Sequence, residues 1–218
     1  MEQKNEHLKN LAEIRSLMER SSRFISLSGL SGISAGIIAL AGAATAFFYL
    51  DFDKRYTNWS EYYQITTQRN INQTTLVLLG LAALVFILAL SSGIFFTTRK
   101  ALKNNQKIWD QTTKRLLFHV FIPLTAGGIF CLVLLYHEIY YLIAPATLMF
   151  YGLALLNGSK FTFNDIQYLG ISEIVLGLLS SVFIGYGLIF WAVGFGILHI
   201  VYGWIMFNKY EKRKSATE

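Results

Sequence analysis

Six apolar stretches, each long enough to cross a lipid bilayer, constrain what this chain can fold into more than any other feature. They cover residues 24–50, 74–97, 116–136, 139–157, 167–185 and 187–207. About 20 apolar residues in a helix span the ~30 Å hydrocarbon core of a membrane, and a helix satisfies its own backbone hydrogen bonds in lipid. The sequence therefore predicts an all-α, polytopic membrane protein built as a bundle of six transmembrane helices.

Two shorter segments flank the six-span domain, which we place at residues 24–207. Residues 1–23 carry Leu8, Leu11, Ile14 and Met18 at helical spacing, a pattern that predicts a short amphipathic helix lying on the cytoplasmic side. Residues 208–218 form a basic tail that we also expect in the cytoplasm.

The orientation follows from the distribution of lysine and arginine. If both termini are cytoplasmic, 16 of the 19 basic residues fall on that side and only Lys54, Arg55 and Arg69 fall outside. Cytoplasmic loops of membrane proteins carry such an excess, so both termini are predicted to be cytoplasmic. The net charge of +6 is then explained by basic loops beside anionic lipid headgroups and implies no nucleic-acid partner. We expect the plasma (inner) membrane of a bacterium.

Glu173 and His199, in the fifth and sixth stretches, are the most informative polar residues. Each shares a helix face with small residues, and each lies about eight residues, or ~12 Å, from the same end of an antiparallel hairpin. Ionisable side chains deep in spans are costly and usually face the protein interior. We therefore expect the two side chains in direct or one-water contact inside the bundle.

His119 and Ser31 complete the candidate polar intramembrane site. Pro123 removes a backbone donor and frees the carbonyl of His119, so His119 is predicted to lie at a kink. Gly29-Leu30-Ser31-Gly32 resembles the G-x-S-G motif of rhomboid proteases, six-span enzymes with a serine nucleophile and a histidine base on another span. That motif stands in the fourth span of those enzymes and here in the first, so we expect no enzymatic activity.

Small residues at intervals of three and four mark the predicted helix-packing faces. Such ladders let two helices approach closely in lipid. They predict that the first, fifth and sixth spans converge through Gly32, Gly36, Gly177, Gly196 and Gly203.

Two functions remain after these observations. The leading prediction is a structural, accessory or interaction membrane protein in which Glu173 and His199 fasten two spans together, because fastening requires no further feature. The alternative is a small transporter or channel-like protein in which the same pair is proton- or solute-linked. No cofactor or metal is expected, since no His pair stands four residues apart and Cys131 is the single cysteine. The expected partners are the lipid bilayer and either a second copy or a membrane partner protein.

Overall fold

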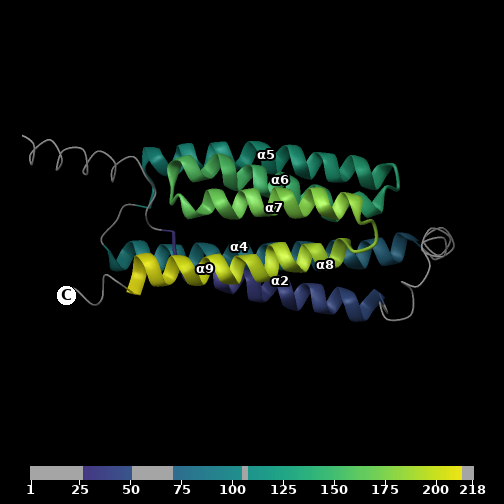
Figure 1. Ribbon diagram of the computed structural model, residues 1–218, viewed down its shortest axis with the longest axis horizontal. Helices are drawn as coiled ribbons and strands as arrows, with labels where there is room; N and C mark the ends of the chain where they lie inside the picture. The colour runs from purple at the N-terminus through teal and green to yellow at the C-terminus, as the bar shows by residue number, and fades with distance from the viewer. Residues whose placement is uncertain (1–26, 51–70, 105–107, 213–218) are drawn as a thin grey trace, which may run out of the picture.

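The computed structural model describes residues 27–50, 71–104 and 108–212 (Figure 1). Its helices, labelled as in the figure, are α2 (Gly29–Leu50), α4 (Ile71–Lys103), α5 (Gln111–Tyr136), α6 (Ile143–Gly158), α7 (Asp165–Val182), α8 (Gly187–Trp191) and α9 (His199–Phe207). Two π-helical segments, η4 (Ala192–Leu198) and η5 (Asn208–Lys212), lie on either side of α9, so one helical rod runs from α8 to Lys212.

Six helices of the described residues are long and apolar enough to cross a membrane. The prediction of an all-α fold with six spans is confirmed, and the chain is an integral membrane protein. Helical structure continues past the predicted end of the last span at residue 207 as far as Lys212. The predicted amphipathic helix at residues 1–23 and the tail from residue 213 lie outside the described residues.

The spans form two layers, which Figure 1 shows one above the other. We call them the α6 layer, formed by α5, α6 and α7, and the α2 layer, formed by α2, α4 and the last span from α8 to η5. Contacts are dense within each layer and sparse between them, where α6 and α7 meet α8, η4 and α9. The helices therefore make fewer contacts across the interface between the layers than within either layer.

The glycines of α2 and of the last span let these two helices approach closely. A Cβ added to Gly36 would lie 2.6 Å from the carbonyl oxygen of Gly196, and one added to Gly203 would lie 2.7 Å from that of Gly29. Gly32 is comparably tight, since its Cβ would lie 3.1 Å from Cα of Gly203. The first and sixth spans therefore pack closely against each other at these glycines.

The glycines of α7 correct the predicted convergence of the first, fifth and sixth spans. An added Cβ on Gly177 would lie 3.0 Å from the carbonyl oxygen of Pro145, and one on Gly170 would lie 2.8 Å from that of Gly152. Both neighbours belong to α6, so the fifth span uses its small residues against the fourth span and not against the first. Gly170, Glu173 and Gly177 share one side of α7, where the glycines pack against α6 and the longer Glu173 side chain reaches past them to His199 in the other layer.

The two ends of the layer interface are built differently. At one end, the short segment from Phe183 to Tyr186 joins α7 directly to α8, and Gly185 adopts a φ of 97°, which favours glycine. At the opposite end, Asp165 begins α7 and η5 ends the last span. The first end is closed by this short turn. At the second end the longer connection of residues 104–110 leads from α4 to α5, and side chains of the two layers are in contact there.

Candidate functional site

Glu173 lies halfway along α7, about 12 Å from the start of that helix at 1.5 Å per residue. Its side chain has an exposed fraction of 0%. Neither carboxylate oxygen accepts a hydrogen bond from any residue that the structure describes. A buried polar group without such a partner is rare in proteins, and this one is an acid at membrane depth.

His199, the first residue of α9, lies across the layer interface from Glu173. Its Nδ1 atom is 3.5 Å from Oε1 of Glu173 and 3.0 Å from the carbonyl oxygen of Gly194. The first distance is that of an ion pair rather than of a hydrogen bond, whereas the second is a normal hydrogen bond. The structure thus brings the two residues of the predicted pair together without joining them by a hydrogen bond.

Tyr151, on α6, holds the far side of the His199 ring. Its hydroxyl oxygen is 2.7 Å from Nε2 of His199. Because the Gly194 carbonyl can only accept, Nδ1 carries a hydrogen, and in the neutral ring Nε2 then accepts a hydrogen bond from the Tyr151 hydroxyl. Both ring nitrogens are therefore occupied, and the ring is fixed with its Nδ1 edge toward Glu173.

The π-helical segment η4 makes room for the carboxylate. Gly194 lies within it, and a Cβ on this glycine would collide with Oε2 of Glu173 and lie 2.6 Å from Cδ2 of Leu148. The wider winding of a π-helix leaves carbonyl groups outside the usual i to i−4 pattern, and such segments recur at functional sites. Here the Gly194 carbonyl accepts a hydrogen bond from Nδ1 of His199. The Glu173 carboxylate occupies the space that a side chain at position 194 would need.

Aromatic rings enclose the histidine on the side of the last span. The Phe195 ring centroid lies 4.9 Å from that of Tyr151 and 4.9 Å from that of Trp191. Leu148, which is completely buried beside Gly194, adds an apolar side chain next to the carboxylate. In such surroundings a charge is far costlier than in water.

His119 and Ser31, the other two predicted site residues, lie in different environments. His119 stacks on Phe161 at 4.9 Å between ring centroids, within the α6 layer. The Ser31 hydroxyl donates to the carbonyl oxygen of Ser28 at the start of α2. Each of these contacts stays within one layer. The structure instead groups Glu173 with His199 and Tyr151.

Tyr151 and Gly194 are the site residues that sequence reasoning missed. A tyrosine in an apolar span usually indicates an interfacial position, which hides a buried role. Gly194 and Gly196 mark a weak point in the last helix, but sequence periodicity does not distinguish a π-helical segment from an α-helix.

The site is thus a buried carboxylate between two layers that accepts no hydrogen bond from the described residues, facing a histidine that is held by a tyrosine and a backbone carbonyl. Its geometry and chemistry are the basis for assigning a function, because no protein-family model, no curated protein and no solved structure matches the chain.

Proposed function

We propose that this chain is a small membrane protein that transports protons, in which the Glu173 carboxyl binds and releases the proton. One observation carries this proposal: the Glu173 carboxylate is completely buried between the two layers and accepts no hydrogen bond from the described residues. An ionised carboxylate so placed is costly, while a neutral acid is tolerated. Buried acids in spans recur in proton relays of pumps and transporters for this reason.

The position of the pair supports the same proposal. Glu173 belongs to the α6 layer and His199 to the α2 layer, and the contacts between the layers are sparse. Transporters commonly place their coupling site where two bundles meet, because relative movement of the bundles alternates access to it. A proton needs no cavity of its own, so the close packing around Gly194 is compatible with this cargo.

A second candidate is a structural protein in which the pair only fastens the two layers. The hydrogen bond from Tyr151 to His199 favours it, since it joins α6 to the last span at 2.7 Å. Glu173 fits that role less well. A comparison within α7 makes the point: Asp165 accepts bonds from Lys209 and Tyr210 and so fastens the same layers, whereas Glu173 accepts none among the described residues.

Proton flux in proteoliposomes tests the choice. Purified protein is reconstituted around the pH-sensitive dye pyranine, and a potassium diffusion potential is imposed with valinomycin. We expect proton uptake by the wild-type protein to exceed that of Glu173→Gln several-fold, with both proteins equally folded. Glu138→Gln, the same change at an exposed carboxylate in the turn after α5, is the matched control and should retain full flux.

Equal flux in wild type and Glu173→Gln would overturn the transport proposal. If, in addition, Tyr151→Phe lowered the thermal stability in detergent while Glu173→Gln did not, the fastening role would be favoured.

We also propose that both termini face the cytoplasm. The support is the sequence distribution, in which 16 of the 19 basic residues fall on that side. An alkaline-phosphatase fusion is expected to be active after Glu138 and inactive at the C-terminus. Activity at the C-terminus would reverse the orientation. A bacterial plasma membrane and the lack of enzymatic activity stay predictions.

A further inference from the structure

The end of the layer interface opposite the turn from Phe183 to Tyr186 is held by Asp165, the first residue of α7. Lys209 Nζ donates to both Asp165 oxygens at 3.0 Å, and the Tyr210 hydroxyl donates to Oδ2 at 2.6 Å. Asp165 belongs to the α6 layer, while Lys209 and Tyr210 lie in η5 of the α2 layer. These charge-assisted bonds therefore connect the two layers.

Aromatic contacts reinforce this connection. The rings of Phe163 and Tyr210 stack with centroids 4.1 Å apart, and Lys100 Nζ lies 5.5 Å from the Phe163 centroid. Phe163 precedes α7, and Lys100 lies near the end of α4. The segment between α6 and α7 is thus held from the side of the α2 layer.

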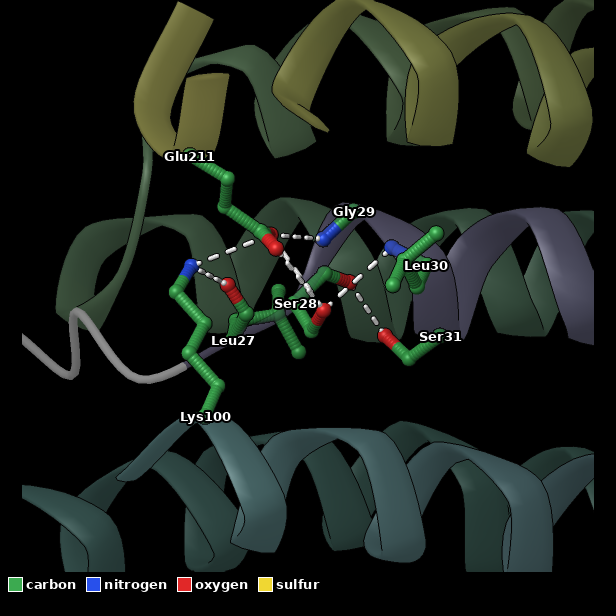
Figure 2. A network of polar contacts seen from close by, with 7 residues as sticks. All are labelled: Leu27, Ser28, Gly29, Leu30, Ser31, Lys100 and Glu211. Atoms are coloured by element: carbon green, nitrogen blue, oxygen red, sulfur yellow. Dashed lines mark hydrogen bonds and ion pairs between the residues drawn. The ribbon is translucent and has the colours of Figure 1, made fainter. Parts of the chain in front are cut away.

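The next residue of η5, Glu211, points into its own layer, as Figure 2 shows. Its carboxylate accepts from the backbone N–H of Gly29 at 2.7 Å, from the Ser28 hydroxyl at 3.2 Å and from Lys100 Nζ at 3.3 Å. Lys100 also donates to the carbonyl oxygen of Leu27 at 2.6 Å. Glu211 therefore caps the start of α2 and fixes η5 to α2 and α4.

We propose that η5 is a clasp that closes this end of the layer interface, and that release of Asp165 from Lys209 and Tyr210 opens a path for water to Glu173. This inference rests on the proposed function, because it assigns the opening through which the Glu173 carboxyl exchanges its proton. Asp165 and Glu173 lie on the same helix, about 12 Å apart along its axis. An opening at the clasp consequently leads toward the site along α7.

The exposure of the partners indicates which half of the clasp opens. The side chains of Lys100 and Glu211 are 13% and 17% exposed; that of Asp165 is similarly buried, with 16% exposed, but its partner Lys209 is 49% exposed. An ion pair with a half-exposed member is weakened by water and salt and exchanges readily. Glu211 thus serves as the fixed anchor, and the contact with Asp165 is the releasable one.

Cysteine cross-linking tests the clasp. In a Cys131→Ser background, cysteines replace Asp165 and Lys209, and a short bis-methanethiosulfonate reagent links them reversibly. Access to Glu173 is measured as its rate of amide formation with a water-soluble carbodiimide and glycine ethyl ester, read by peptide mass. Glu173→Gln gives the background.

Before linking, loss of the ion pair should raise the reaction rate several-fold over the Cys131→Ser parent. Linking should lower it to or below the parent rate, and reductant should restore it. The matched control places cysteines at positions 34 and 92, whose serine hydroxyls lie 3.1 Å apart within the α2 layer and away from the clasp, and linking them should leave the rate within twofold. A Glu173 rate that is the same with 165 and 209 linked or free overturns the clasp, as does a folded protein in which this pair never links.

The two proposals fail in different ways. Glu173-dependent proton flux that persists with positions 165 and 209 linked overturns the clasp and leaves the transport function standing. Flux that does not depend on Glu173 overturns the transport function, while a reversible change in the Glu173 reaction rate still supports the clasp.

Discussion

The Glu173 carboxylate occupies space that any side chain at position 194 would need. Gly194→Ala is therefore expected to displace the carboxylate or η4, because an added Cβ would collide with Oε2 of Glu173. Overpacking of this kind costs about 1–3 kcal/mol. Thermal unfolding in detergent measures the loss. Gly128→Ala, where an added Cβ would meet nothing within 4 Å, is the control, and equal effects of the two changes would contradict the assigned contact.

Tyr151 offers a second test at the scale of single residues. Tyr151→Phe removes the hydroxyl that donates to Nε2 of His199. A buried nitrogen left without its donor costs about 1–3 kcal/mol, and the freed ring loses its fixed orientation toward Glu173. We expect lower thermal stability together with slower proton flux. Tyr168→Phe, at an exposed position on α7, should change neither quantity.

At the scale of helices, the contact between α2 and the last span depends on glycine. Gly36→Leu should separate the two backbones, because even a Cβ would lie 2.6 Å from the carbonyl oxygen of Gly196. The expected loss is about 1–3 kcal/mol or more in the free energy of unfolding. An added Cβ on Gly93 of α4 would meet nothing within 4 Å, so Gly93→Leu should be near neutral. The measurement is denaturation in a mild detergent. If the two variants were equally stable, the close contact assigned to Gly36 would be wrong.

The sequence predicts helices better than it predicts their neighbours. Six spans follow from apolar length alone, which is a local property. The depth of Glu173 and His199 also follows from counting residues along two joined helices, and the structure has the two side chains 3.5 Å apart. Tyr151 lies in α6, outside the hairpin formed by α7 and the last span. Only the packing of α6 against these helices brings it to His199.

The contacts of Val85, Lys209 and Glu211 also depend on how the helices pack, which the sequence does not reveal. The sequence of α4 is almost uniformly apolar and does not indicate which residues face lipid, yet Val85 is buried, and its Cγ2 atom occupies the space beside Gly42. Likewise, Lys209 and Glu211 read as parts of a solvated basic tail. Their roles depend on Asp165 and Gly29, from which they are separated by 44 and 182 positions in the sequence, and single-sequence patterns carry no signal at such separations.

At the scale of the whole molecule, α4 and α5 present large apolar surfaces on the outside of the two layers. Phe86, Ile87, Phe121 and Ile122 are among their exposed side chains. In a bilayer these residues are expected to contact lipid, so a photoactivatable lipid should label α4 and α5 strongly and spare the buried Leu148 and Leu169. Protection of α4 alone would instead indicate that a second copy or a partner protein covers that helix.

The turn from Phe183 to Tyr186 has a mechanical consequence for the clasp at the other end. If the layers tilt about this turn, displacement grows with distance from it: Glu173 lies ten residues, or about 15 Å, before Phe183, and Asp165 lies eighteen residues, or about 27 Å, before it. Glu173 then moves about half as far as Asp165. A gap of roughly 3 Å for one water at the carboxyl requires roughly 5 Å of travel at the clasp, which breaks all contacts to Asp165 made at 2.6–3.0 Å. Wetting of the acid and rupture of the clasp thus become a single geometric event, and partial loosening leaves the carboxyl dry.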